Sequence, residues 1–137
     1  METIRLGRTN LVVSKNSFGA LPVRRVNMEE AGRLLRKAYD GGINYFDTAR
    51  AYSDSEEKLG NALSDVREHI IISTKTGATC VEDFWKHLTQ SLTLLKTDYI
   101  DIYQFHNPAF CPKPGDGTGL YEAMLEARHK EKYASSV

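Results

Sequence analysis

The sequence predicts an α/β protein with a parallel sheet, in which strands and helices alternate along the chain. Four short apolar runs occupy residues 17–21, 43–46, 70–74 and 99–105, a spacing that accommodates a strand, a helix and two loops. The runs are almost continuously apolar, which is typical of strands buried on both faces. Between the runs, apolar residues recur at helical spacing. These observations together predict about four consecutive strand–helix units.

A β-hairpin is expected ahead of these units. The short segments Ile4–Leu6 and Leu11–Val13 flank Gly7–Asn10, which contains the glycine and asparagine that tight turns favour. We therefore expect a single domain in which residues 3–14 form the hairpin and residues 16–137 form the strand–helix units.

Capping and stop signals place the first two helices. Asn27 and Glu30 form a capping pair, and Gly41 marks the end of the helix that follows. The pattern Ser53-x-x-Glu56 predicts the start of a second helix in the same way. The residues expected on the buried faces of these helices are Ala31, Leu34, Leu35, Ala38 and Tyr39, and Leu59, Ala62, Leu63 and Val66.

Two further helices and a fifth strand are expected in the second half of the chain. The pattern Thr79-x-x-Glu82 predicts a third helix, and apolar spacing predicts a fourth over residues 119–130. Residues 107–118 hold three of the four prolines and predict a long ordered loop, and residues 133–137 begin the fifth strand. The expected buried positions are Val81, Phe84, Trp85, Leu88, Leu92 and Leu95, and Leu120, Met124 and Ala127.

Length, charge and cysteine content exclude several classes of function. The chain has 137 residues, the size of one domain, and its 18 basic and 18 acidic side chains give a net charge of zero. A protein that binds nucleic acid or a membrane surface would need a basic excess. No apolar run approaches the roughly 20 residues of a membrane helix. The two cysteines, Cys80 and Cys111, show no disulfide or metal-site spacing, so we expect a cytoplasmic protein without a metal.

The chain length bears on how the sheet closes. A closed barrel of eight strand–helix units takes about 250 residues, so this chain ends near the middle of one. The sequence leaves two alternatives, an open four-stranded α/β layer or part of a larger barrel. The apolar helix faces favour the partial barrel, which leaves an exposed edge strand. We expect a truncated chain whose open edges permit self-association.

Titratable residues stand at the ends of three successive predicted strands. Asp47 follows the second strand, Lys75 the third and His106 the fourth, and Tyr52 lies in the loop after Asp47. Because the carboxyl ends of parallel strands lie at one edge of the sheet, these side chains can meet over one opening. Each residue alone is more often structural, as a solvated charge, a helix cap or a packed ring. Their coincidence at one level of the sheet favours a functional site.

A phenol, an ammonium group, a carboxylate and an imidazole together suit proton donation to a carbonyl group. A free phenol has a pKa of about 10, so tyrosine is a weak acid near neutral pH, and a nearby ammonium group favours the ionised phenol. Lys75 can supply the ammonium group, Asp47 can hold it, and His106 can bind the carbonyl oxygen. None of these groups can supply a hydride, so a reduction needs a cofactor.

Three strand-end motifs connect the sequence with a known family. Phe46–Tyr52, Ser73–Lys75 and Gln104–Asn107, together with the opening Leu6–Ser14, resemble the aldo-keto reductases. The resemblance spans nearly the whole chain, about the first half of a family member. It implies a (β/α)8 barrel of the TIM-barrel type, closed at the bottom by the hairpin, of which this chain is the N-terminal half.

The resemblance also implies an activity, a cofactor and site residues. The activity is the NADPH-dependent reduction of an aldehyde or ketone, a small carbonyl compound, to an alcohol. Tyr52 would be the general acid, assisted by Asp47, Lys75 and His106. The residues implied to lie beside the nicotinamide are Gly19, Ala20, Leu21 and Asp47.

A narrower resemblance concerns residues 51–56 and 110–117. These segments are similar to a bacterial subgroup whose members often carry a C-terminal ferredoxin-type iron–sulfur domain. This sequence contains no such domain, and we expect no cluster in it. Residues 130–137 depart from the family's usual entry into the fifth strand, and the family's contacts to the adenosine phosphate come from later segments.

Three other interpretations remain open. Lys75 at a strand end can attack a carbonyl, as in a Schiff-base aldolase, although Asp47 should keep it protonated. The same scaffold also suits a non-catalytic NADP-binding or regulatory protein, and a further alternative is an inactive fragment. Binding of NADPH and the effect of Tyr52→Phe on turnover distinguish these alternatives.

Overall fold

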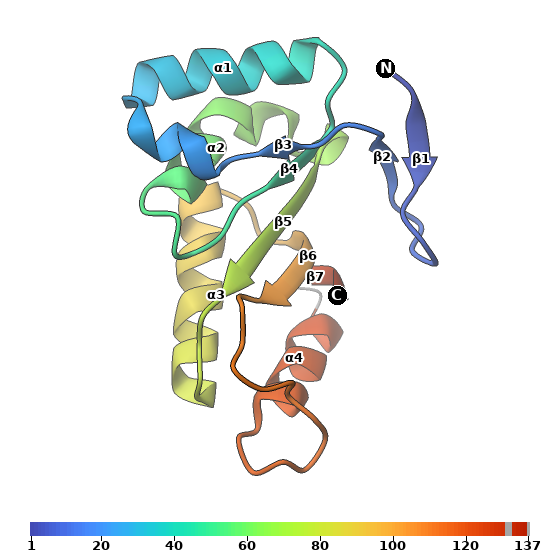
Figure 1. Ribbon diagram of the computed structural model, residues 1–137, viewed down its shortest axis with the longest axis vertical. Coiled ribbons are helices and arrows are strands. Elements are labelled where there is room, and N and C mark those ends of the chain that lie inside the picture. The colour runs from blue at the N-terminus through green and yellow to red at the C-terminus, as the bar shows by residue number, and fades with distance from the viewer. Residues whose placement is uncertain (131–132, 137) are drawn as a thin grey trace.

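The computed structural model describes residues 1–130 and 133–136, and it consists of a hairpin and a parallel α/β layer (Figure 1). The hairpin pairs β1 (Thr3–Arg5) with β2 (Val12–Ser14) in antiparallel register, as predicted. The second sheet is parallel and has the strand order β3-β4-β5-β6-β7. Its strands are β3 (Phe18–Gly19), β4 (Tyr45–Asp47), β5 (Ile71–Thr76), β6 (Ile100–Phe105) and β7 (Tyr133–Ser136).

Helices connect successive strands and pack against one another in chain order. This succession of parallel neighbours joined by helices is the arrangement of a (β/α) barrel, and the described strands form part of one. The predicted fifth strand is present as β7, while Val137 lies outside the described residues. The helices are η1 (Leu21–Arg25), α1 (Met28–Asp40), α2 (Ser55–Leu63), η2 (Ser64–His69), α3 (Val81–Leu95) and α4 (Leu120–His129).

The core lies between the parallel sheet and the helices. Phe46 of β4, Ile72 of β5 and Tyr103 of β6 are buried. Phe84 of α3 packs edge-on against the Tyr103 ring, with the ring centroids 5.8 Å apart. The predicted apolar faces are buried or partly buried except for Leu34 of α1, which is 44% exposed. That prediction is wrong because α1 has α2 as its main neighbour, which leaves the outer edge of its apolar face in solvent.

The predicted helix starts hold for α1 but not for α2 and α3. The Asn27 side chain accepts a hydrogen bond from the Glu30 amide at 2.8 Å, and α1 is capped as predicted. Ser53 lies in the turn before α2 with a φ of +53°, and the Glu56 side chain turns into the interior instead of completing a cap. α3 begins at Val81 without a side-chain cap. The same local pattern therefore served a different purpose at Glu56.

A buried ion pair orders the amino ends of β5 and β6. Arg67 Nη2 lies 2.8 Å from Asp101 Oδ2, which also accepts a hydrogen bond from the Ile72 amide at 2.9 Å. The Arg67 guanidinium donates to the carbonyl oxygens of Ile70 and Tyr99 and lies 4.0 Å from the centroid of the Tyr99 ring. This network stands at the end of the sheet opposite to the predicted functional residues.

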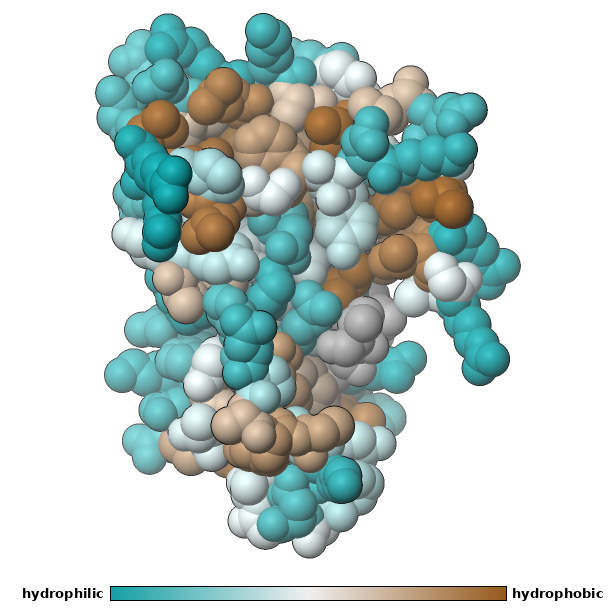
Figure 2. Space-filling view, viewed as in Figure 1, coloured by the Kyte–Doolittle hydropathy of each residue, from teal (hydrophilic) through white to brown (hydrophobic). Residues whose placement is uncertain are grey.

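The helices and the exposed apolar side chains of the described residues bear on membrane contact. None of the helices in that part of the chain is long and apolar enough to cross a bilayer. Figure 2 shows apolar surface at the hairpin, where Ile4 and Val12 are each 53% exposed.

Candidate active site

Asp47 and Lys75 form an ion pair between neighbouring strands. Asp47 ends β4 level with Ser73 of β5, so Lys75 lies two residues further along β5 on the same face. Lys75 Nζ donates to the two Asp47 carboxylate oxygens at 2.8 and 2.7 Å and to the Thr48 carbonyl oxygen at 2.8 Å. All three protons of the ammonium group therefore have acceptors. Lys75 lies within β5, not after it as predicted, because the strand continues to Thr76.

Tyr52 and His106 approach this pair from the loops after β4 and β6. Lys75 Nζ lies 5.3 Å from the centroid of the Tyr52 ring, and the Tyr52 and His106 rings meet edge to face with centroids 5.4 Å apart. Backbone bonds fix both loops, from the Tyr52 amide to the Ala49 carbonyl and from the His106 amide to the Thr76 carbonyl. The structure thus brings together the predicted residues, here called the strand-end cluster: Asp47, Tyr52, Lys75 and His106.

The strand-end cluster combines a phenol, an ammonium group, a carboxylate and an imidazole in one partly buried site. Lys75 places a cation 5.3 Å from the centroid of the Tyr52 ring, in a partly buried site where charges interact more strongly than in water. The side chain of Lys75 is 16% exposed and that of Asp47 is 32% exposed. The Asp47 carboxylate holds the cation in place, and the His106 imidazole lies edge to face with the Tyr52 ring.

Polar side chains that the sequence interpretation missed line the same face of the sheet. Ser73 Oγ donates to Gln104 Oε1 at 3.1 Å. Burial raises the pKa of the Tyr45 phenol, and a hydrogen bond with Ser73 opposes this effect. The signal was available, because Tyr45 lies two positions before Asp47 and Ser73 lies two positions before Lys75, and residues two apart in a strand share a face. The open face of the sheet is therefore polar next to the strand-end cluster.

A second polar group lies on the helix side of the sheet, under the Tyr52 loop. Glu56 is fully buried, and its Oε1 accepts a hydrogen bond from Arg50 Nη1 at 2.6 Å. Its Oε2 accepts one from Thr74 Oγ1 at 2.8 Å. Burial raises the pKa of the Glu56 carboxyl, opposed by the Ser91 and Thr74 hydroxyl groups and by the charge of Arg50. The sequence singled out Glu56 only as a helix cap.

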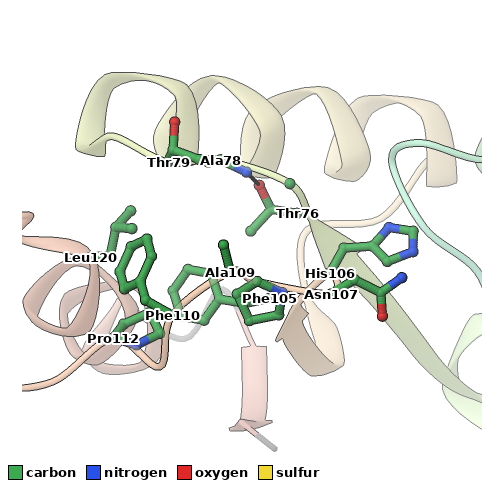
Figure 3. A pocket seen from close by; sticks show the side chains of 12 residues that line it. Thr76, Ala78, Thr79, Phe105, His106, Asn107, Ala109, Phe110, Pro112 and Leu120 are labelled. Atoms are coloured by element: carbon green, nitrogen blue, oxygen red, sulfur yellow. Dashed lines mark hydrogen bonds between the residues drawn. The ribbon is translucent and has the colours of Figure 1, made fainter.

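An apolar cleft of about 250 Å³ adjoins His106 (Figure 3). The segments after β5 and β6 form its walls, and Phe105, Phe110 and Leu120 are among its apolar side chains. In Figure 3 the His106 imidazole points away from these three side chains. The cleft therefore lies beside the strand-end cluster, and Tyr52 is not among its lining residues.

The residues implied to contact a nicotinamide lie next to Asp47. Gly19 pairs with Asp47 across β3 and β4, and a Cβ atom added to it would meet no atom within 4 Å. Leu21 is 38% exposed. Ala20 is fully buried, and its amide and carbonyl groups bond to the Asp47 carbonyl and to Ser55 Oγ, so it supports this surface from behind. The side of Gly19 on which a side chain would stand is therefore unobstructed.

Comparison with known proteins identifies the family. The profile of the Aldo/keto reductase family matches residues 11–129, a range that includes the whole strand-end cluster. The chain belongs to the aldo/keto reductase family. The holo form of aldo-keto reductase AKR11C1 from Bacillus halodurans superposes with a TM-score of 0.88 at 30% identity, covering 99% of this chain and 49% of that one. The predicted fold is confirmed: the chain forms part of an aldo/keto reductase (β/α)8 barrel.

Two curated relatives show how much of an aldo/keto reductase the chain covers. "Uncharacterized oxidoreductase YqkF" of Bacillus subtilis is 34% identical over 120 residues, covering 77% of this chain and 39% of that protein. A "probable voltage-gated potassium channel subunit beta" of rice, Oryza sativa, is 32% identical over 131 residues, covering 79% and 38%. The chain therefore spans about two-fifths of the length of these relatives.

Cysteine and histidine side chains show no metal centre within the described range of the chain. No group of three or more His, Cys, Asp or Glu residues in that range is placed to hold a metal ion. Cys80 precedes α3 and Cys111 lies in the loop before α4, and both are exposed and free.

Proposed function

We propose that the strand-end cluster is the proton-donating site of an NADPH-dependent reductase that converts an aldehyde or ketone into an alcohol. The observation that carries the proposal is a tyrosine ring in contact with both an ammonium group and an imidazole at the carboxyl ends of neighbouring strands. In barrel enzymes the catalytic residues lie at this end of the strands.

Proton transfer in the proposed reaction runs through Tyr52. The substrate's carbonyl oxygen binds between the Tyr52 hydroxyl and a ring N–H of His106, which both donate hydrogen bonds to it. As the carbonyl carbon accepts a hydride, the oxygen gains negative charge and takes the proton of Tyr52, which completes the alcohol. Lys75 stabilises the phenolate that remains, and Asp47 keeps Lys75 in place.

The unobstructed side of Gly19, beside Asp47, supports binding of a nicotinamide ring, in line with the NADPH that the sequence resemblance implies. Gly19 and Leu21 would hold the nicotinamide ring next to the Asp47 carboxylate, with Ala20 supporting them from within. When bound, the cofactor supplies the hydride, which no protein side chain can provide.

The contacts of Lys75 argue against a Schiff-base aldolase. A lysine nucleophile must be unprotonated to attack a carbonyl. The Lys75 amine is surrounded by three acceptor oxygens, two of which belong to the Asp47 carboxylate. These contacts suit an ammonium group, and the lysine is better placed to stabilise charge than to form a covalent bond.

A second candidate function is binding of NADPH without turnover, in a regulatory protein. The rice relative, named a probable channel subunit, favours this candidate at 32% identity. Both functions require that Gly19, Leu21 and Asp47 bind the nicotinamide ring, but only the reductase requires the Tyr52 proton. The two functions therefore differ in one measurable step.

Cofactor binding and turnover test the proposed function separately. NADPH fluorescence reports binding to the chain, and loss of NADPH absorbance with aromatic aldehydes or ketones reports reduction. Tyr52→Phe should lower turnover by about 10²–10⁴-fold and leave the affinity for NADPH unchanged, because only the transferable proton is lost. Tyr39→Phe on α1 is the matched control and should keep full turnover.

The possible results separate the candidates. Equal turnover in Tyr52→Phe and in the wild type would remove Tyr52 from the acid role. Binding of NADPH without any turnover would favour the regulatory candidate. A folded chain that binds no NADPH would refute both.

A further inference from the structure

Arg50, Glu56 and Thr74 tie the Tyr52 loop to the strand that carries Lys75. Glu56 accepts hydrogen bonds from Arg50 at 2.6 Å and from Thr74 at 2.8 Å. Arg50 Nη2 also donates to the Ser53 carbonyl oxygen at 3.2 Å, and the Arg50 amide donates to the Lys75 carbonyl oxygen at 3.0 Å. The network therefore binds the loop at Arg50, before Tyr52, and at Ser53, after it, and keeps the loop next to Lys75.

The burial of Glu56 calls for an explanation beyond packing. Its side chain is 0% exposed, and that of Arg50 is 20% exposed. A buried ion pair is often no more stabilising than apolar side chains of the same volume, so packing alone gives little reason for it. It does, however, enforce one geometry, because a carboxylate with bonds to two partners tolerates little displacement.

The loop itself is held in an unfavourable backbone conformation. Ser53 follows Tyr52 directly and has a φ of +53°, in the left-handed region that is costly for residues other than glycine. Such a conformation persists only where the surroundings enforce it. Arg50 supplies such a contact, because it binds the carbonyl oxygen of Ser53.

We propose that Arg50 and Glu56 are positioning residues that hold the Tyr52 ring between Lys75 and His106. The inference rests on the proposed function, because only a phenol that delivers a proton needs this accuracy. The contacts of the Tyr52 ring with Lys75 and His106, at 5.3 and 5.4 Å, are weak individually and do not set its place alone. The hydrogen bonds of Arg50 and Glu56 supply the remaining restraint on the position of the ring.

The expected effect on catalysis is a loss of turnover with little change in cofactor affinity. A misplacement of about 1 Å at a reacting group can cost about 10²-fold in rate. Arg50→Lys keeps a positive charge for Glu56 but loses the second donor, which binds Ser53. We therefore expect kcat to fall by up to about 10²-fold, while the KM for NADPH stays the same.

Nuclear magnetic resonance tests the positioning role without any need for activity. The Tyr52 ring, edge to face with His106, shifts the imidazole carbon-bound proton signals, and Tyr52→Leu measures that shift. Arg50→Lys and Glu56→Gln should each remove most of it. Asp101→Asn alters a buried ion pair of similar exposure at the other end of the sheet, so it is the matched control and should leave the shift unchanged.

Retention of the full His106 shift in folded Arg50→Lys and Glu56→Gln would overturn the proposal. A measurement on the wild type guards against unfolded variants, because hydrogen exchange at the Tyr52 and Ser55 amides reports the loop directly. The proposal expects their protection to match that of the Thr48 amide, which bonds to β5, and rapid exchange would contradict it. Failure of carbonyl reduction would leave these results intact and would count against the proposed function alone.

Discussion

Replacement of Arg67 by methionine tests whether the buried network at the amino ends of β5 and β6 holds the sheet together. Methionine is an apolar side chain of similar length, so the variant fills much of the same space and lacks the guanidinium group. That group donates hydrogen bonds to Asp101, to Thr97 and to the carbonyl oxygens of Ile70 and Tyr99. The side chains of Arg67 and Asp101 are 10% and 9% exposed, so water has little access to replace the lost donors.

The structure sets the size of the expected effect. Removal of one partner from a buried ion pair costs about 3–5 kcal/mol, because the other charge remains buried. Asp101 keeps the hydrogen bond from the Ile72 amide at 2.9 Å, so we expect the lower end of that range, about 3 kcal/mol. The free energy of unfolding of an ordinary domain is about 5–15 kcal/mol, so the variant should still fold but with a much smaller free energy of unfolding.

Urea unfolding, followed by circular dichroism, measures this loss. The midpoint should fall without a change in the slope with urea concentration. Arg67→Met with Asp101→Asn should recover part of the loss, because no unpaired charge is then buried. Lys15→Met is the control, since its pair with Glu2 is exposed and should contribute less than about 1 kcal/mol. A loss of the same size in Arg67→Met as in Lys15→Met would refute the reasoning.

Three further predictions concern single elements. Asn27→Ala removes the side-chain cap of α1 and should cost about 1 kcal/mol in thermal unfolding; no change would contradict the cap. Gly60→Ala would drive a methyl group into the Leu94 carbonyl oxygen where α2 crosses α3, so it should destabilise the fold by about 1–3 kcal/mol, and an unchanged urea midpoint would refute that contact. Burial raises the pKa of Glu56 above 4.5, so the folded state retains a proton that the unfolded state loses as pH rises. The stability of Glu56→Gln relative to the wild type should therefore increase from about pH 4.5 upward. A difference between the two urea midpoints that stays the same at every pH would contradict this.

The hairpin, the parallel strands and α1 were predictable because their signals are local. Alternation, apolar runs and turn residues act within a few positions of one another. The Asn27 cap is an example, since its side chain bonds to an amide three residues away. The end of β6 before His106 followed from the same local pattern, and Asp47, expected just after its strand, is the last residue of β4.

The errors arose where a side chain's partners are distant in sequence. Ser53-x-x-Glu56 has the form of a capping box, yet the Glu56 carboxylate bonds to Thr74, which is 18 residues away. Leu34 fits the periodicity of α1, but that helix has too few neighbours to cover it. A local pattern cannot show which of its residues the rest of the fold will surround.

The sequence by itself determined the order of the elements and the identity of the polar residues at their ends, because periodicity and turn chemistry depend on neighbours along the chain. The tertiary structure decided which of those residues touch. Asp47 and Lys75 are 28 positions apart and meet only because the parallel register of β4 and β5 places them on one face. Tyr52 joins them because its loop is folded against β5 through Arg50, a contact whose geometry depends on three-dimensional packing and has no counterpart in sequence spacing.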